Sequence, residues 1–319
     1  MPVLIDPPRW PAHGTSWSHL VSDTSLYELR SFARAHGIPD RGFDLDHYDV
    51  PADRFESLVA AGAVPLDGRG LARALASSGL RVPGRERRRA ARPELLARWD
   101  GLWHGHDPAP HAVGEDLVDR WREPHRVYHT RLHLADALDA LDVLLARQSP
   151  GGRAAWHARV ALWFHDAVHD GEARRDEERS AALVRTLLGP LVGSTFPDTG
   201  PSALSVGDVD EVARLVLLTA DHSPSDDDPT GALVSDADLA VLGADPARYD
   251  RYAHQVRAEY AHVADDAFRL GRAAVLSELL ELASGRGLFR TPAGVQDWAA
   301  RAAANVRRER DLLTGPGWR

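Results

Sequence analysis

Apolar and polar positions follow two different patterns along this chain, and the change falls near residue 84. Before it, short apolar runs alternate with amphipathic segments. The run VLID at 3–6 predicts a buried strand, and residues 23–37 predict a helix, because apolar side chains recur at helical spacing up to Gly37. Strands and helices that alternate in this way are typical of a small α/β domain, which we predict over residues 1–83.

Beyond residue 94 the pattern is almost entirely helical. Residues 128–147 carry an apolar stripe at helical spacing, and residues 154–168 are apolar on most faces, as in a helix at the centre of a bundle. The basic run GRERRRAARPE at 84–94 is typical of a linker or of the exposed start of a helix. We therefore predict a mainly α protein, with an all-helical domain over residues 95–319 after the small α/β domain.

The amino-acid composition excludes several classes of chemistry. The 319 residues include no cysteine, and all 38 basic residues are arginine. A thiolate nucleophile, an iron–sulfur cluster, a lysine Schiff base and a Walker A lysine are therefore excluded. The net charge of -9 argues against broad binding to nucleic acid or to anionic membranes. No apolar stretch is long enough for a membrane span, and the first residues do not resemble a signal peptide, so we expect a cytoplasmic protein.

The stretch ALWFHDAVHD at 161–170 places four ionisable side chains in an otherwise apolar run. A buried charge is costly unless it is paired or bound to a metal. His133 is in helical register with apolar neighbours and therefore faces inward, and Asp236 and Asp238 stand at the start of a later apolar helix. Three separate helices thus direct histidine or aspartate side chains toward a common interior. This donor set suits Mn, Fe, Zn or Mg ions.

The order of these residues resembles a known family. His, then His-Asp, then Asp on an all-helical scaffold resembles the HD superfamily of metal-dependent phosphohydrolases. One branch is closer still, and its ordered motifs correspond here to YHTRLHL, WFHDAVHD, DEERSA, TADH, DADLAVLG and YDRYAHQVRAEYAHV. The resemblance covers residues 95–315 and implies an HD-type helical bundle that hydrolyses a phosphoester, with a small phosphorylated molecule such as a nucleotide as its substrate.

The resemblance also implies a set of metal ligands. It assigns a divalent ion, which could be Mn, Fe, Co, Ni, Zn or Mg, to His133, His165, Asp166 and one of Asp236 and Asp238. Asp236 and Asp238 are two residues apart on one helix, so only one of them can face the ion squarely, and we favour Asp236. His169 stands where the branch usually has an aromatic residue, which argues against His169 as an essential ligand.

Further roles follow from the same motifs. Asp166 and Glu177 would act in catalysis, and four residues would contact the substrate: His129, His222, Arg257 and Tyr260. An ordinary structural interpretation stays open for four of them: His129 could be a surface histidine, Glu177 a solvated acid, His222 a helix-end histidine and Arg257 a surface arginine. The implied mechanism is hydrolysis by a metal-activated water, with arginine and histidine donors stabilising the developing charge.

Two other classes of protein compete with a hydrolase. A non-catalytic ligand sensor could use the same cavity, although the complete ligand set argues against a pure sensor. A di-iron oxygenase on the same scaffold would need additional ligands, for which His169 and His222 are the nearest candidates. The number of bound ions and their redox activity would separate an oxygenase from a hydrolase.

The N-terminal segment concentrates polar and aromatic side chains in two short stretches. DPPRWPAHGTSWSHLVSD and DHYDVP contain His13, His19, Asp23, His47 and Asp49 beside Trp10 and Trp17. Residues 1–83 resemble a small domain family of unknown function (DUF4031), so the resemblance assigns no function to this segment. One interpretation is that these residues hold long loops together. The other is a second polar site, for a nucleotide or a metal, with Asp6 at a strand end, a typical ligand position in α/β domains.

Overall fold

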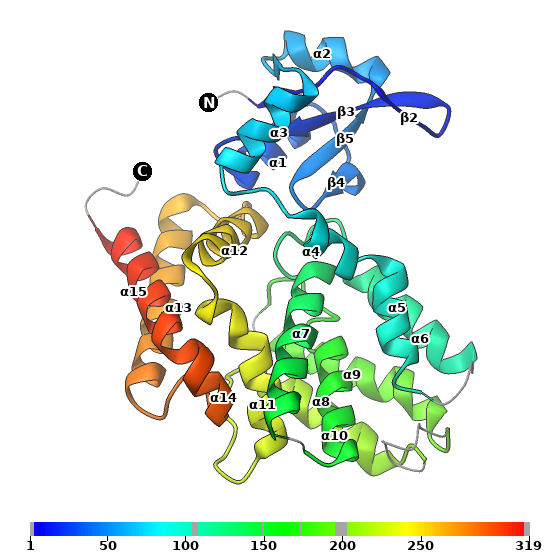
Figure 1. Cartoon of the computed structure of the whole chain (residues 1–319), viewed down its shortest axis with the longest axis vertical. Coiled ribbons are helices and arrows are strands. Elements are labelled where there is room, and N and C mark those ends of the chain that lie inside the picture. Colours follow the sequence, from blue (N-terminus) through cyan, green and yellow to red (C-terminus); the bar gives the residue numbers. More distant parts are fainter. Residues whose placement is uncertain (1–2, 104–107, 149, 173, 195–202, 316–319) are drawn as a thin grey trace. The chain divides into compact units, whose positions relative to one another are not determined.

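The computed structural model of the chain describes residues 3–103, 108–148, 150–172, 174–194 and 203–315 (Figure 1). It divides into an N-terminal unit, Met1–Gly84 with Asp250–Phe268, and a helical unit, Arg85–Tyr249 with Arg269–Arg319. The fold is mainly helical with a small α/β region at the N-terminus, which confirms the fold class predicted from the sequence pattern. Within the described ranges, no helix is both long enough and apolar enough to cross a membrane.

The N-terminal unit is built on a sheet of short strands. In chain order these are β1 (Leu4–Ile5), β2 (Trp10–Ala12), β3 (Thr15–Val21), β4 (Phe43–Asp44), β5 (His47–Pro51) and β6 (Val64–Pro65). Their order across the sheet is β4-β5-β3-β1-β6, with β2 also paired to β3. β1 and β6 are parallel, and the other pairs are antiparallel. β3 therefore has β5 on one side and β1 on the other.

Local sequence explains how this unit turns and where its first helix begins. The β2–β3 hairpin turns at His13 and Gly14, whose φ angles of 50° and 79° suit a tight two-residue hairpin turn. Helix α1 (Leu26–Ala35) lies within the predicted range 23–37 and begins after Ser25, whose side chain accepts the backbone N–H of Glu28. The other helices before residue 80 are α2 (Phe55–Ala60) and α3 (Gly68–Ser77).

Residues 250–268 group with the N-terminal unit, whereas the sequence resemblance assigns them to the helical domain. They comprise most of α12 (Pro246–Glu259) and the first residues of α13 (Asp265–Ser284). Arg251 donates to the carbonyl oxygen of Arg81 at 3.3 Å, and the guanidinium of Arg257 lies 4.8 Å from the ring centre of Tyr27. These contacts attach the segment to residues of the N-terminal unit.

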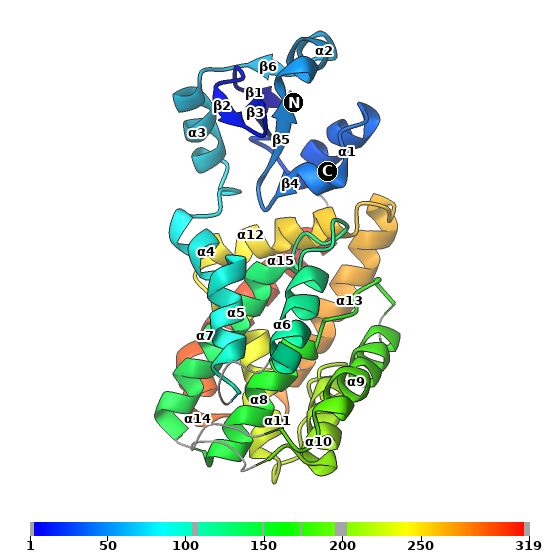
Figure 2. The same ribbon diagram turned by 90° about the vertical axis from the view of Figure 1, so that its right-hand side faces the viewer.

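The helical unit is a bundle around one central helix. Its further helices are α4 (Gly84–Arg89), α5 (Arg92–Asp100), α6 (Pro108–Arg120), α7 (Arg131–Gln148), α8 (Gly152–Phe164), α9 (Arg175–Leu188), α10 (Val206–Leu218), α11 (Pro229–Leu239), α14 (Pro292–Gly294) and α15 (Ala300–Thr314). α7, α8 and α11 pack against one another, and α10 packs on α8, α9 and α11 (Figure 2). Leu162, Trp163 and Phe164 of α8 are at most 1% exposed, so the predicted central helix is α8.

The basic run at 84–94 is helical and is not an extended linker. α4 and α5 cover most of it, and its arginines pair with acidic residues of the helical unit. Arg89 forms ion pairs with Asp136 and Asp139 of α7, the second at 2.5 Å. Arg92 pairs with Glu115 of α6 at 3.1 Å. The run is basic because it packs against acidic helix surfaces, and the pattern of charge alone does not reveal those partners.

Candidate metal centre

Three helices of the helical unit bring histidine and aspartate side chains together. His133 lies in the first turn of α7, His165 follows the last residue of α8, and Asp238 lies in the last turn of α11. The Nε2 atoms of His133 and His165 are 3.1 Å apart. Asp238 Oδ1 lies 3.0 Å from His133 Nε2 and 3.4 Å from His165 Nε2. These three side chains could hold one metal ion.

Asp166 supplies a fourth donor atom to this cluster. Its Oδ2 lies 3.1 Å from His165 Nε2 and 3.7 Å from His133 Nε2. When a metal lies about 2.1 Å from each ligand atom, neighbouring ligand atoms are about 3.0 Å apart at a right angle and about 3.4 Å apart at a tetrahedral angle. Four of these five separations lie between 3.0 and 3.4 Å, and the one between Asp166 Oδ2 and His133 Nε2 is longer, at 3.7 Å. His133, His165 and Asp238 therefore fit a single cation, and Asp166 lies beside them as a further donor.

The surroundings of the two histidines determine which nitrogen faces the cluster. His165 Nδ1 lies 2.8 Å from the carbonyl oxygen of Leu162 and donates its proton there, so Nε2 is the nitrogen directed at the cluster. His133 Nδ1 lies 3.1 Å from the hydroxyl of Tyr128. Both histidines are at most 3% exposed. Contacts of this kind are typical of histidines that bind metals, because they hold the ring in one orientation.

A buried arginine anchors the end of α8, where His165 and Asp166 lie. Arg126 Nη1 donates to the carbonyl oxygen of Asp166 at 2.6 Å, and its Nη2 donates to that of Ala167 at 3.1 Å. These two carbonyl groups lie in the turn that follows Phe164, the last residue of α8, and buried backbone carbonyls outside a helix need partners elsewhere. Arg126 therefore holds the backbone of the His-Asp pair in place. No motif or spacing in the sequence had singled out Arg126, whereas Tyr128 begins the motif YHTRLHL without having been given a role.

The charges in the cluster favour a cation. Burial lowers the pKa of His165, but the carboxylates of Asp166 and Asp238 raise it more, and the pKa lies well above its ordinary value. Burial raises the pKa of Asp166, but His165 and His129 lower it more, so this carboxyl is ionised. The pKa of Asp238 is lowered against burial in the same way, first by His165. Two buried carboxylates require positive charge beside them, which a divalent ion would supply.

Our preference for Asp236 as the aspartate ligand is wrong. Its carboxylate accepts the backbone N–H groups of Arg290 and Thr291, each at 2.8 Å, and the Thr291 hydroxyl at 2.6 Å. Residues two apart on a helix point about 200° apart, so Asp236 and Asp238 face opposite sides of α11. Asp236 is committed to the start of α14, where a side chain at Gly294 would collide with it. Asp238 is the aspartate in the cluster.

Two of the predicted substrate contacts lie at the edge of the cluster. His129 Nε2 is 4.0 Å from Asp166 Oδ2, and its ring centre is 3.9 Å from that of His169. His222 Nε2 is 3.6 Å from Asp238 Oδ2. Burial lowers the pKa of His222 below its ordinary value, which keeps the ring neutral near pH 7. Both histidines therefore lie beside the carboxylates of the cluster, where a molecule bound next to the cluster would meet them.

Glu177, the predicted catalytic acid on α9, also belongs to this neighbourhood. Its Oε2 is buried and has no hydrogen-bond partner among the described residues. Burial raises the pKa of Glu177, and the negative charge of Asp166 raises it further. An unpartnered carboxyl oxygen is costly unless it has another use. Glu177 is therefore not the solvated surface acid of the ordinary interpretation.

Arg257 and Tyr260 belong to the N-terminal unit, whereas the cluster belongs to the helical unit. The guanidinium of Arg257 pairs with Asp265 and donates to the carbonyl oxygens of Tyr260 at 2.9 Å and Val263 at 3.3 Å. It also lies 4.7 Å from the ring centre of Phe268. These contacts account for the Arg257 side chain without a phosphate.

Comparison with known proteins concerns the N-terminal unit. A family model described as a protein of unknown function (DUF4031) matches residues 3–78, which confirms the small N-terminal domain expected from the sequence. No curated protein and no solved structure matches the chain. The function of the helical unit therefore has to be argued from its own side chains.

Proposed function

We propose that the helical unit is a metal-dependent phosphohydrolase that cleaves a phosphoester of a small molecule, such as a nucleotide. The observation that carries this proposal is the cluster of His133, His165 and Asp238, with Asp166 Oδ2 lying 3.1–3.7 Å from the Nε2 atoms of the two histidines. These donors follow the chain order His, His-Asp, Asp that the resemblance to HD phosphohydrolases selects. The motif order and the geometry therefore support the same site.

The donor set agrees with this chemistry. Imidazole and carboxylate ligands without a thiolate suit Mn, Fe, Co, Ni, Zn or Mg. A bound divalent ion would supply a water of lowered pKa and would polarise a phosphoryl oxygen. The neutral ring of His222 can donate a hydrogen bond to a phosphate oxygen, and His129 lies on the side of Asp166. Such donors stabilise the charge that develops during hydrolysis.

Glu177 is the group that we assign to proton transfer. A general acid or base works best when its pKa is near the working pH, and burial moves the pKa of Glu177 upward in that direction. Its buried Oε2 has no competing partner among the described residues, so it can exchange a proton with water or with a leaving group. This role needs no further residue and uses an oxygen that is otherwise unexplained.

The two alternatives remain distinguishable. A di-iron oxygenase needs a second ion, and His222 faces Asp238 Oδ2, the carboxylate oxygen opposite the one that faces His133 and His165. Such an enzyme would contain two redox-active ions in the helical unit. A ligand sensor would have no use for the Oε2 atom of Glu177, which is buried without a hydrogen-bond partner among the described residues. Counting bound ions and measuring hydrolysis separate the three proposals.

Metal-dependent hydrolysis by the full-length protein tests the proposal. Protein loaded with Mn, Co, Ni, Zn or Mg is assayed on p-nitrophenyl phosphate, bis-p-nitrophenyl phosphate, and cyclic and linear nucleotides. Asp166→Asn is compared with Asp170→Asn, which removes the same charge four residues away. Asp170 is 58% exposed and pairs with Arg179, so it makes a suitable control.

We expect Asp166→Asn to lower the hydrolysis rate by about 100-fold or more, because it weakens the hold on the metal. Asp170→Asn should change the rate by less than about twofold, since surface ion pairs contribute little. Equal losses in the two variants, or no metal-dependent hydrolysis of any phosphoester in the panel, would contradict the proposal.

A further inference from the structure

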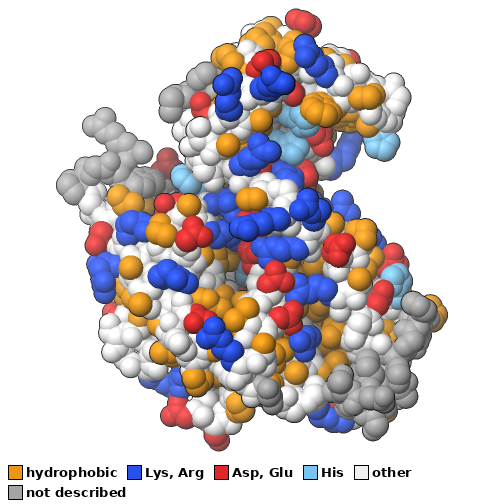
Figure 3. Space-filling view, in the orientation of Figure 1, with side chains coloured by type: hydrophobic (Ala, Val, Ile, Leu, Met, Phe, Trp, Pro, Cys, Tyr) orange, Lys and Arg blue, Asp and Glu red, His pale blue; other side chains and the backbone are white. Residues whose placement is uncertain are grey.

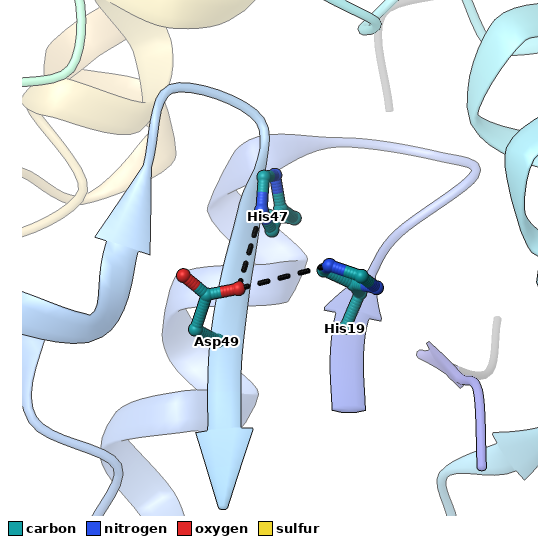
Figure 4. A group of neighbouring side chains, drawn as sticks. All are labelled: His19, His47 and Asp49. Atoms are coloured by element: carbon teal, nitrogen blue, oxygen red, sulfur yellow. Dashed lines mark ion pairs between the residues drawn. The ribbon is translucent and has the colours of Figure 1, made fainter. Parts of the chain in front are cut away.

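A second group of histidine and aspartate side chains lies on the sheet of the N-terminal unit (Figure 4). His19 of β3 is paired directly with Asp49 of β5 in the antiparallel register. His47 comes two residues before Asp49, and alternate residues of a strand point to the same face. The pairing therefore puts all three side chains on one face of the sheet, and Figure 4 shows them directed toward one another.

The distances between these side chains are those expected around a metal. Asp49 Oδ1 is 3.5 Å from His47 Nε2 and 3.8 Å from His19 Nε2. The three donor atoms all lie within 4.8 Å of one another. Both nitrogen–oxygen distances exceed the range of about 2.7–3.2 Å for a direct hydrogen bond. They are closer to the separation of about 3.4 Å between ligands of a tetrahedral ion.

A buried carboxylate holds the other nitrogen of each imidazole. His19 Nδ1 is 3.2 Å from Asp6 Oδ2, and His47 Nδ1 is 2.8 Å from Asp46 Oδ1. Asp6 is 3% exposed and Asp46 is 1% exposed. Each carboxylate is itself fixed by a backbone N–H, that of His19 on Asp6 at 2.5 Å and that of Val82 on Asp46 at 2.6 Å. Carboxylates placed in this way orient histidines in metal sites and increase their basicity.

These contacts show which nitrogen of each ring faces Asp49. Both imidazoles turn Nδ1 toward a buried carboxylate and Nε2 toward Asp49. A carboxylate accepts a hydrogen bond from the ring nitrogen that it faces, which leaves the other nitrogen to bind a metal.

We propose that these converging acceptors form a divalent metal site, with Nε2 of His19, Nε2 of His47 and the carboxylate of Asp49 as ligands and with Asp6 and Asp46 orienting the histidines. Two imidazoles and one carboxylate suit Zn, Mn or Fe(II). The site lies wholly in the N-terminal unit and does not depend on the function proposed for the helical unit.

The site has open positions for a ligand. The Asp49 side chain is 47% exposed, and three protein ligands leave coordination positions to solvent, as in catalytic metal sites. A cavity of about 660 Å³ includes His19 and Asp49 in its wall, together with Trp10, Trp17 and Arg41. Its volume is in the range of small-molecule sites, about 300–1,000 Å³.

The cavity wall indicates the class of molecule that would bind. Trp10 is 55% exposed, which is a large apolar surface to leave in water, and Figure 3 shows histidine side chains beside hydrophobic ones on the surface of this unit. Tryptophan rings bind planar groups, and an arginine binds a phosphate or carboxylate. The ligand of the site is therefore a small planar molecule with an anionic group that reaches the metal.

Counting cobalt bound to the full-length protein tests the metal site. His165→Ala removes a ligand of the helical centre, so one Co²⁺ per chain should remain in this variant. Adding His47→Gln should abolish that remaining ion. Adding His36→Gln should leave it, because His36 ends α1 in the same unit and is not part of the cluster. The proposal is overturned if the His165→Ala protein binds no Co²⁺ or if His47→Gln and His36→Gln behave alike.

Asp6→Asn separates an orienting role from a purely structural one. In the His165→Ala protein it should weaken Co²⁺ binding by about 10–100-fold, while the number of Co²⁺ ions bound at saturation stays at one per chain. An unchanged affinity would contradict the role of Asp6.

Phenylphosphonate then serves as a planar anionic probe: it should perturb the visible spectrum of the bound Co²⁺, and Arg41→Ala should weaken its binding. No spectral change at saturating probe would exclude this class of ligand.

Discussion

The helical unit and the N-terminal unit each assemble histidine and aspartate donors, but in opposite surroundings. The side chains of His133, His165, Asp166 and Asp238 are 1–15% exposed. Those of His19, His47 and Asp49 are 17–47% exposed. Helix ends converge in the interior of a bundle, whereas a sheet presents one face to its surroundings. Whether the donors lie on helices or on strands therefore determines how far a bound metal would be shielded from water.

The two clusters also place their negative charge differently. In the helical unit both carboxylates lie beside the Nε2 atoms of the two histidines. The Nδ1 atoms of these histidines lie beside a carbonyl oxygen and a hydroxyl. In the N-terminal unit one carboxylate, that of Asp49, lies on the Nε2 side of the histidines. Two further carboxylates, of Asp6 and Asp46, contact the Nδ1 atoms. A buried cluster has to balance charge within itself, while an exposed one can leave positions to water. We expect the helical centre to bind its ion more tightly.

The largest expected effect comes from replacing each of the two aspartates of α11 by asparagine. Asp238→Asn should abolish metal binding at the helical centre, because it removes a carboxylate that contacts both histidines. Asp236→Asn should retain the metal and lower the free energy of unfolding by about 1–3 kcal/mol, because an amide cannot accept all three donors of residues 290–291. Metal analysis and chemical denaturation measure both effects. Loss of metal in Asp236→Asn alone would reverse our assignment.

A smaller effect is expected from Glu177→Gln. The change keeps the size of the side chain and removes the proton-transfer group, so the hydrolysis rate should fall by about 100-fold. The metal content should not change, because Glu177 is not among the four donors. Glu178→Gln, an exposed neighbour on α9, is the matched control. A parallel loss of metal in Glu177→Gln would show that Glu177 is a ligand and not a proton-transfer group.

The smallest effect concerns the strand that carries His47 and Asp49. Burial raises the pKa of Tyr48, between them, to about 12 from an ordinary value of 10.0. The unfolded chain therefore loses the Tyr48 proton near pH 10, whereas the folded protein keeps it to about pH 12. Stability should fall as the pH rises through this window. Thermal unfolding should show that Tyr48→Phe weakens this dependence, whereas Tyr27→Phe, at an exposed tyrosine of the same unit, does not.

Much of this architecture follows from local patterns. The central position of α8 was predictable because its residues are apolar on most faces, and His133, His165 and Asp166 follow from motif order. The choice between Asp236 and Asp238 was not predictable, because it depends on residues 290–291, which lie far along the chain. The sheet cluster depends on the pairing of His19 with Asp49, and strand register is set by long-range packing. Arg126 acts through backbone carbonyls of another segment and leaves no motif.

Anomalous X-ray diffraction from crystals of the full-length protein, grown with Co²⁺ and measured at its absorption edge, tests the metal assignment of the helical unit most directly. We expect a strong peak about 2.0–2.2 Å from Nε2 of His133, Nε2 of His165 and the carboxylate oxygens of Asp166 and Asp238. The same map should show a second peak at His19, His47 and Asp49. An ion bound at Asp236, or a helical centre without any anomalous peak at saturating Co²⁺, would contradict the account.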